Sequence, residues 1–290
     1  MGAITISAVS GALGGMVENI DLSQPLTAPT LRELKQALAE YEVLFFRNQE
    51  MSPSDHLRLA KHFGQPQLHE AYPHVDGHPE ITILENDREN PSKIEVWHTD
   101  MTFRPCPPLG SILHGVSIPE RGGDTLFASL SSAYESLSTP LKAFVEGLTA
   151  VHDFSYGFKE SLAEPGGRER LKQMVEDNPP VEHPVVIEHP VTRKKALYVN
   201  ALFTTHIKEL CPDESKSVLS HLYQHIVLPE HCCRFSWEEN SVAFWDNRIT
   251  QHKPVNDYWP QHRKMQRITC LLYTSPSPRD VEESRMPSSA

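Results

Sequence analysis

The residues best suited to metal chemistry in this chain are His98 and Asp100, within the stretch Trp97-His98-Thr99-Asp100-Met101-Thr102-Phe103. On a β-strand, residues i and i+2 point to the same side, so this spacing predicts that the imidazole and the carboxylate aim at one point. One further imidazole would complete the two-His-one-carboxylate set that holds Fe(II) in non-haem oxygenases. His252, which follows the turn Asp246-Asn247-Arg248, is the candidate third ligand.

The spacing alone is not specific, because His74-Val75-Asp76 repeats it in a chain that contains 16 His. That second pair lies between Pro73 and Gly77, which are typical of a turn. We therefore interpret His74 and Asp76 as a solvated loop. Whether His98 and Asp100 form a metal site therefore depends on residues elsewhere in the chain that could complete it.

Length and composition restrict the class of protein. The chain has 290 residues, of which 39% are hydrophobic and 22% charged, as in globular proteins of one or two domains. The formal net charge of −11 disfavours nucleic acid or an anionic membrane as a partner. Five cysteines without a Cys-x-x-Cys pair disfavour a disulfide framework or a zinc site. With no signal peptide and no apolar run of membrane-spanning length, we expect a cytoplasmic protein.

Hydrophobic periodicity predicts many short strands and a few helices. The expected helices are residues 30–42, a segment that begins at Ser52 and Pro53, 131–148 with a break near Pro140, and 213–227. The expected strands are residues 4–9, 43–46, 81–84, 110–116, the segment after Gly122 and Gly123, 185–187, 196–200, 233–237, 241–245 and 268–272. Residues 150–180 are polar, and we expect them to leave the core as a lid-like excursion that covers the active site.

This order of elements shows no βαβ rhythm and no internal repeat. Short strands with helices at the periphery favour a mostly β fold, namely a jelly roll (a double-stranded β-helix) decorated with helices. We expect residues 1–272 to form one domain of this kind. Residues 273–290 are polar and rich in Pro and Ser, which predicts a disordered tail or one foreign to the natural protein.

Four groups of residues follow one another along the chain. They are Trp97-His98-Thr99-Asp100, then Gly122-Gly123-Asp124-Thr125, then Trp245-Asp246-Asn247-Arg248 with His252, and finally Arg263 with Arg267. This order resembles the TauD/TfdA family of Fe(II)- and 2-oxoglutarate-dependent dioxygenases, over about residues 4–270. The resemblance implies Fe(II), 2-oxoglutarate and O2, a small anionic substrate and a homo-oligomeric enzyme.

The resemblance also implies which residues hold the metal and the cosubstrate. His98, Asp100 and His252 would bind Fe(II). Thr125 and Arg263 would hold the distal carboxylate of 2-oxoglutarate, for which a hydroxyl donor and a bidentate guanidinium are well suited.

A second set of residues is implied for a sulfonate substrate. The expected substrate-binding residues are His69, Tyr72, Met101, Phe158, Phe203 and Arg267. Arg267 and His69 would bind the sulfonate, with help from the backbone N–H of Met101, while the aromatic residues would line the pocket. The implied reaction hydroxylates the carbon next to sulfur in taurine or a related alkylsulfonate. It releases sulfite and an aldehyde, together with succinate and CO2.

The loop before the metal-binding stretch leaves the substrate open. It reads Ser92-Lys93-Ile94-Glu95-Val96, in which Ile94 cannot bind an ammonium through its side chain and Lys93 would repel one. Glu95 could compensate only if its carboxylate points to the substrate. A longer alkylsulfonate, an alkyl sulfate ester or a carboxylate-bearing substrate is therefore an alternative to taurine. An alternative of another class is a non-catalytic jelly-roll binding protein, in which these His and Asp are ordinary polar residues.

Overall fold

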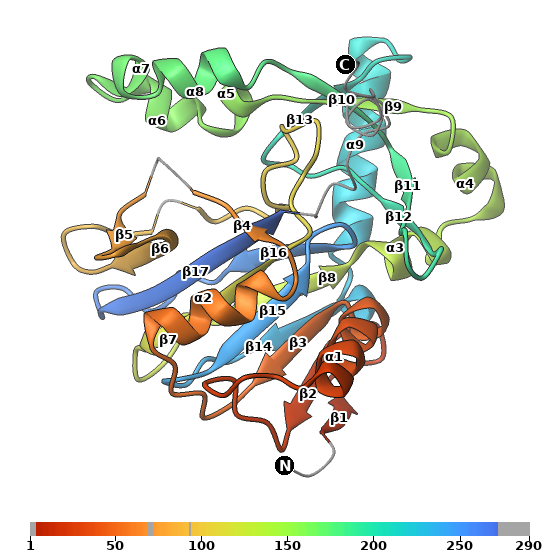
Figure 1. Ribbon diagram of the computed structural model, residues 1–290. Helices are drawn as coiled ribbons and strands as arrows, with labels where there is room; N and C mark the ends of the chain where they lie inside the picture. The colour runs from red at the N-terminus through yellow and green to blue at the C-terminus, as the bar shows by residue number, and fades with distance from the viewer. Residues whose placement is uncertain (1–3, 69–71, 93, 272–290) are drawn as a thin grey trace, which may run out of the picture.

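The computed structural model describes residues 4–68, 72–92 and 94–271. Two β-sheets lie face to face at its centre, and helices cover their outer sides (Figure 1). The predicted mostly β fold with peripheral helices is confirmed, and the two sheets form a jelly roll. His69, Lys93 and the predicted tail 273–290 lie outside the described residues.

The larger sheet has nine strands, and its neighbouring strands are antiparallel except for the parallel pair β2 and β3. In spatial order they are β1 (Thr5–Ala8), β2 (Gly15–Glu18), β3 (Val43–Phe46), β15 (Val242–Asp246), β7 (Gly110–Ser117), β17 (Arg263–Leu271), β6 (His78–Asn86) and β5 (His74–Val75), with β4 (Gln65–Pro66) beside β17. The smaller sheet has the order β14 (Cys232–Phe235), β8 (Thr125–Ser129), β16 (Thr250–Pro254).

Side chains that point alternately to the two faces of each strand build the core between the sheets. In β3, Val43 and Phe45 belong to the apolar cluster that joins both sheets, whereas Leu44 and Phe46 face the helices on the outer side. Phe45 stacks on Phe235 of the smaller sheet, with ring centroids 4.2 Å apart. Residues of one strand thus fill two separate apolar layers.

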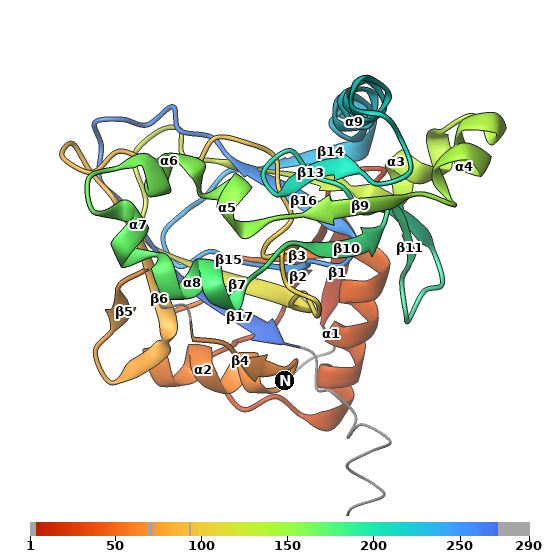
Figure 2. The same ribbon diagram turned by 90° about the horizontal axis from the view of Figure 1, so that it is seen from above.

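Helices α1 (Ala28–Tyr41) and α2 (Pro53–Lys61) cover the outer side of the larger sheet. Figure 2 shows the layers in succession, from these two helices through the larger sheet to the smaller sheet and α9 (Pro212–Ile226). Ser52 caps α2 and forms a reciprocal capping box with Asp55, as the sequence predicts from Ser52 and Pro53. Within the described ranges, none of the helices combines the length and apolarity that a membrane span requires.

The segment between β8 and β16 adds helices and short strands outside the jelly roll. They are α3 (Leu130–Ser136), α4 (Thr139–Val145), β9 (Thr149–His152), α5 (Phe154–Gly157), α6 (Lys159–Ala163), α7 (Gly167–Arg170), α8 (Lys172–Asp177), β10 (Val181–Pro184), β11 (Val186–Glu188), β12 (Lys195–Leu197), β13 (Thr204–Ile207) and the 3-10 turn Pro229–His231. The break near Pro140 and the hairpin β11–β12 are confirmed. The excursion 150–180 carries the short helices α5 to α8, at the upper left of Figure 1.

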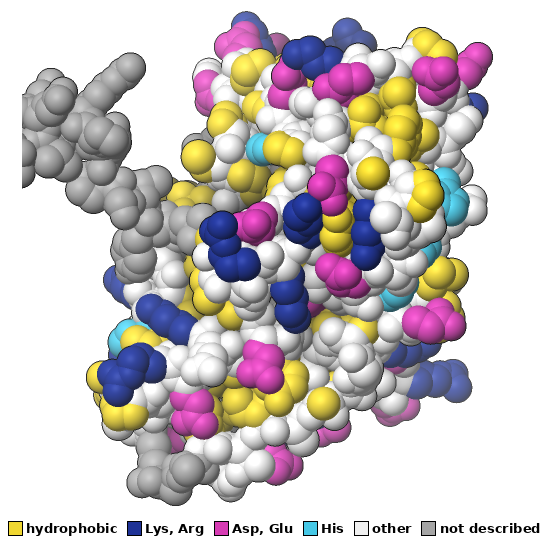
Figure 3. Space-filling model, turned by 90° about the vertical axis from the view of Figure 1, so that its right-hand side faces the viewer, with side chains coloured by type: hydrophobic (Ala, Val, Ile, Leu, Met, Phe, Trp, Pro, Cys, Tyr) yellow, Lys and Arg dark blue, Asp and Glu magenta, His cyan; other side chains and the backbone are white. Residues whose placement is uncertain are grey.

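The face on the right-hand side of Figure 1 is shown in Figure 3. Lys and Arg side chains are interspersed there with Asp and Glu side chains, and apolar groups appear between them. This face therefore presents charges of both signs side by side.

Candidate metal centre

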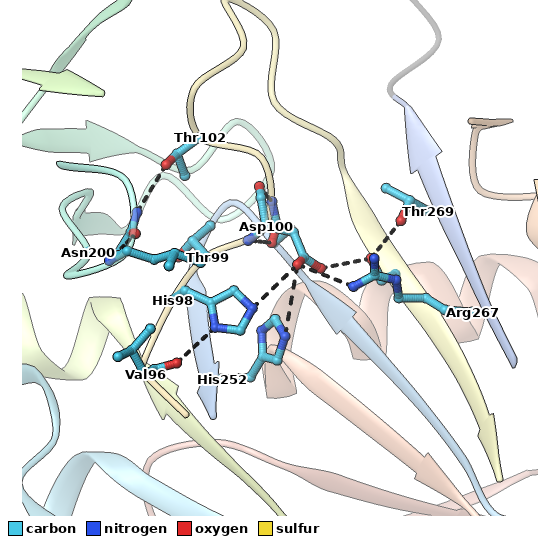
Figure 4. A network of polar contacts seen from close by, with 12 residues as sticks. Val96, His98, Thr99, Asp100, Thr102, Asn200, His252, Arg267 and Thr269 are labelled. Atoms are coloured by element: carbon cyan, nitrogen blue, oxygen red, sulfur yellow. Dashed lines mark hydrogen bonds and ion pairs between the residues drawn. The ribbon is translucent and has the colours of Figure 1, made fainter. Parts of the chain in front are cut away.

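The structure brings His98, Asp100 and His252 together at one point between the two sheets (Figure 4). His98 pairs with His252 of β16 through two backbone hydrogen bonds, of 3.0 and 2.8 Å, so a short bridge extends the smaller sheet. Their Nε2 atoms lie 3.6 and 3.9 Å from Oδ1 of Asp100. All three side chains are buried, and one ligand atom from each lies within 4.8 Å of the others.

The prediction that His98 and Asp100 lie on one strand is wrong for Asp100. Strand pairing stops at the His98 bridge, and Asp100 begins a turn in which Met101 has a φ of 54°. The backbone N–H and C=O of Asp100 are bonded instead to the side-chain amide of Asn247. The two side chains converge because of this turn, not because of a strand repeat.

The protonation of the two imidazoles fits metal binding. Nδ1 of His98 lies 2.9 Å from the carbonyl oxygen of Val96, which can only accept, so Nδ1 carries the hydrogen and Nε2 keeps its lone pair. Burial lowers the pKa of His98, and burial together with neighbouring His98 lowers the pKa of His252 to about 3. Both rings are therefore neutral at physiological pH, the state in which an imidazole binds a metal.

Asp100 is ionised despite its burial. Burial alone would raise the pKa of this carboxyl, but the guanidinium of Arg267 and the neighbouring imidazoles outweigh it, and the pKa falls to about 2. Nη1 of Arg267 lies 3.4 Å from Oδ1, and the hydroxyl of Ser111 donates to Oδ2 at 3.1 Å. Two neutral imidazoles and one carboxylate are the donor set that suits Fe(II) with open coordination positions.

Arg263 and Arg267 point into the same space between the sheets. Both lie on β17, four residues apart, on the face that also carries the buried Met265. Arg267 is next to Asp100, and its guanidinium lies 6.0 Å from the ring centre of Tyr72. At a strand rise of about 3.3 Å per residue, the backbone positions of Arg263 and Arg267 are about 13 Å apart, with Arg263 at the beginning of the strand.

Arg263 and Thr125 share a cage of aromatic rings. The guanidinium lies 5.9 Å from the ring centre of Trp237 and 5.8 Å from that of Tyr258. The indole N–H of Trp237 donates to the hydroxyl oxygen of Thr125 at 2.9 Å, which leaves the hydroxyl hydrogen of Thr125 available to another acceptor. Gly123 keeps this space open, because a Cβ there would lie only 3.2 Å from two atoms of Arg263.

Aromatic side chains gather on the other side of the metal-binding turn. Met101, Phe103, Phe154 and Phe203 form one buried cluster, and Phe158 packs against it from the excursion. Phe154 and Phe158 are stacked with centroids 4.4 Å apart. A cavity of about 330 Å³ adjoins this cluster, lined by Leu68, Met101, Arg104, Pro105, Met174, Asp177 and Asn178. The excursion thus contacts the turn that carries Asp100.

The structure also places the remaining candidates. Asp76 is exposed in the turn between β5 and β6, as the loop interpretation expects, whereas the interpretation is wrong for His74, which is half-buried on β5 opposite Thr82 of β6. Ile94 is half-buried, and Glu95 is exposed with its carboxylate 3.1 Å from the amide nitrogen of Asn256. The same amide nitrogen donates to the carbonyl of Ile94 at 3.0 Å. Asn256 therefore holds Glu95 in place.

Sequence reasoning missed four residues that support the site, which are Ser111, Trp237, Asn247 and Tyr258. Asn247 lies in the Asp-Asn-Arg turn before His252, and this position close to a candidate ligand could have identified it as a residue of the site. Ser111 and Trp237 lie in apolar stretches that read only as strands. Their contacts with Asp100 and Thr125 come from strand pairing across the fold.

The fold and the donor set together define a class, the jelly-roll proteins with a two-His-one-carboxylate centre. The sequence profile described as "Taurine catabolism dioxygenase TauD, TfdA family" matches residues 7–269. The chain belongs to this family of 2-oxoglutarate-dependent dioxygenases.

Three known proteins illustrate the similarity. The alkylsulfatase of Acinetobacter baylyi is 40% identical over 265 residues, which are 90% of this chain and 83% of that protein. The alpha-ketoglutarate-dependent sulfate ester dioxygenase of Pseudomonas putida is 34% identical over 270 residues, 92% of this chain and 89% of that protein. A solved taurine dioxygenase from Burkholderia xenovorans is 35% identical with a TM-score of 0.80, covering 96% and 94% of the two chains.

Proposed function

We propose that this chain is an Fe(II)- and 2-oxoglutarate-dependent dioxygenase that hydroxylates the carbon carrying the sulfonate or sulfate group of an alkyl substrate. The observation that carries the proposal is the convergence of His98, Asp100 and His252 beside the guanidinium of Arg267. A metal centre next to a fixed cation suits an anionic substrate whose reacting carbon lies close to its charge.

The metal would be held by Nε2 of both imidazoles and by Oδ1 of Asp100. The Val96 carbonyl fixes the ring of His98 in the required tautomer, and Ser111 fixes the second carboxylate oxygen of Asp100. Fe(II) with 2-oxoglutarate and O2 supplies the oxidant for C–H hydroxylation, and the cosubstrate leaves as succinate and CO2.

The distal carboxylate of 2-oxoglutarate would be held at the cage of Thr125 and Arg263. The hydroxyl hydrogen of Thr125 is available because Trp237 already donates to its oxygen. Arg263 is buried, and no carboxylate within the described residues is close enough to pair with it, so a dicarboxylate would supply the missing counter-charge.

The sulfur-bearing anion would be bound by Arg267, with Tyr72 beside it. Phe158 and Phe203 would cover the hydrocarbon part of the substrate and keep water away from the reacting carbon. We also infer that the excursion 150–180 acts as a cover, because it supplies Phe158 to this wall.

The tail of the substrate is proposed to be apolar. Ile94 offers no hydrogen bond through its side chain, and Oε1 of Glu95 accepts from the amide of Asn256, which holds this exposed carboxylate against Asn256. A longer alkylsulfonate or an alkyl sulfate ester is better suited to it than taurine. The alkylsulfatase and the sulfate ester dioxygenase among the relatives support this choice.

The two substrate classes differ in their sulfur product. A hydroxyl group on the carbon of a C–S bond gives an α-hydroxysulfonate, which loses a proton and breaks the C–S bond to form an aldehyde and sulfite. A hydroxyl group on the carbon of a C–O–S ester gives a hemiacetal sulfate, which breaks the C–O bond to form an aldehyde and sulfate. Sulfite and sulfate therefore identify the class.

The test is anaerobic loading with Fe(II) and 2-oxoglutarate, followed by O2, with taurine, hexanesulfonate and hexyl sulfate as separate substrates. We expect succinate formation to be stimulated by one of the hexyl compounds well above taurine, with a matching amount of aldehyde. His98→Ala serves as the inactive control. Turnover of taurine above both hexyl compounds would overturn the apolar-tail proposal, and no stimulation by any of the three would overturn the organosulfur proposal.

A further inference from the structure

The side chain of Asn247 bonds to both backbone groups of Asp100. Asn247 is fully buried on the turn between β15 and β16. Its Oδ1 accepts the N–H of Asp100 at 2.9 Å, and its Nδ2 donates to the C=O of Asp100 at 2.8 Å. We propose that Asn247 is a positioning residue, which fixes the backbone of Asp100 and thereby the direction from which its carboxylate reaches the metal.

The need for such a residue follows from the local backbone. His98 is the last residue that pairs with β16, and the chain then turns away at Met101. Asp100 is left buried without a neighbouring strand, and unpaired buried N–H and C=O groups are costly. The amide of Asn247 takes the place of a strand, since it offers one acceptor and one donor to the same residue.

The turn that carries Asn247 is itself held firmly. Oδ2 of Asp246 lies 3.1 Å from Nε2 of His189, and Oδ1 accepts from the guanidinium of Arg248 at 2.8 Å. The hydroxyl of Thr250 donates to the carbonyl of Asp246 at 2.8 Å, at the start of the strand that contains His252. One rigid turn therefore sets the position of His252 directly and that of Asp100 through Asn247.

The backbone of Asn247 also ties this turn to β7. Its N–H donates to the carbonyl of Leu109 at 2.8 Å, just before the strand that carries Ser111. Ser111 in turn bonds to the carboxylate of Asp100. The backbone and the side chain of Asp100 are thus fixed by neighbouring parts of one hydrogen-bonded unit.

The inference rests on the proposed metal centre, and its test must separate positioning from general stability. Asn247→Asp keeps the size of the side chain, but it places a carboxylate oxygen against the carbonyl of Asp100 and removes the donor. Gln49 offers a matched control, because it is a buried amide that accepts from the N–H of Leu22 at 2.7 Å and donates to the carbonyls of Ile20 and Arg47. Gln49→Glu makes the same chemical change at an amide that is bonded to Ile20, Leu22 and Arg47 and not to a metal ligand.

The probe is Co(II) alone, titrated into metal-free protein, with thermal unfolding recorded for each variant. We expect Asn247→Asp to weaken Co(II) binding by roughly 10- to 100-fold, the usual cost of removing a group that orients a metal ligand. Gln49→Glu should lower the unfolding temperature while its Co(II) affinity stays at the wild-type value. Asn247→Ala should weaken Co(II) binding in the same direction.

Two outcomes overturn the inference in different ways. Wild-type affinity for Co(II) in a folded Asn247→Asp protein would remove the positioning role and leave the metal centre intact. No Co(II) binding by the wild type would remove the metal centre and this inference with it. If neither Asn247 variant folds, hydrogen exchange of the wild-type metal-free protein decides. The Asp100 amide should be strongly protected, and exchange as fast as in an exposed loop would contradict its bond to Asn247.

Discussion

Arg263 gives the sharpest test of the proposed cosubstrate site, because its charge is buried and forms no ion pair with any carboxylate of the described residues. Its guanidinium lies against Trp237 and Tyr258, and its Nε has no hydrogen-bond partner. Burial disfavours the charged form of this guanidinium and lowers the pKa of Arg263 below its usual range. Replacing it by Met should therefore stabilise the metal-free protein while it weakens 2-oxoglutarate binding.

The magnitude follows from two opposing terms. A buried ion costs several kcal/mol in proteins, and each cation–π contact returns about 0.5–2 kcal/mol. With two rings beside Arg263, the net cost is on the order of 1–3 kcal/mol. Arg263→Met should then raise the unfolding temperature by about 2–6 °C, at about 2 °C per kcal/mol for a chain of this size. Loss of the charge-assisted pair should cost 2-oxoglutarate about 2–5 kcal/mol, or roughly 30- to 4,000-fold in Kd.

Arg267 is the matched control on the same face of β17. It lies next to the carboxylate of Asp100, so Arg267→Met should destabilise the metal-free protein by leaving that carboxylate buried without its cation. It should also raise the KM for the organosulfur substrate far more than that for 2-oxoglutarate. Calorimetry of the metal-free variants and anaerobic 2-oxoglutarate titration of the Fe(II)-loaded variants measure these effects.

The result that would refute this reasoning is a loss of stability in Arg263→Met, combined with 2-oxoglutarate affinity equal to that of the wild type. Equal effects of both substitutions on both ligands would refute the division of roles between the two arginines.

Two further predictions concern the surroundings of the site. Burial raises the pKa of Glu42 to about 7 from 4.5, so the contribution of this group to stability is fully present below pH 4.5 and is lost as pH rises through about 7, by on the order of 3 kcal/mol. Urea unfolding at pH 5 and 8 measures this loss. Glu42→Gln should remove it, and substitution of the exposed Glu40 by Gln should not. The same decrease in the free energy of unfolding between pH 5 and 8 in Glu42→Gln as in the wild type would contradict this prediction. A Cβ at Gly157 would overlap the ring of Phe203, whereas one at Gly147 would meet nothing within 4 Å. Gly157→Ala should therefore cost about 1–3 kcal/mol of stability and raise the substrate KM, while Gly147→Ala should change neither, and similar effects of the two would disprove this packing.

Local sequence signals predicted much of the fold. The strand Val43–Phe46 has the predicted bounds, and α2 begins at Ser52, because alternation, periodicity and capping act between near neighbours. The predicted helix 30–42 begins two residues earlier, at Ala28, where Thr27 provides the cap.

The errors and omissions at the site have a common cause. Asp100 was expected on a strand, but its backbone partner is Asn247, 147 residues away. The direction of Glu95 depends on Asn256, 161 residues away. Such pairings depend on how distant strands meet, and no local pattern contains that information.

The central claim is that His98, Asp100 and His252 hold Fe(II) chelated by 2-oxoglutarate. The most direct measurement is the visible absorption spectrum during anaerobic titration with Fe(II) and 2-oxoglutarate. His98→Ala removes a proposed ligand, and His74→Ala removes the histidine of the second His-x-Asp pair, on strand β5. We predict a charge-transfer band in the wild type and in His74→Ala, and its loss in His98→Ala. No band in the wild type, or the same band in His98→Ala, would contradict the proposed metal centre.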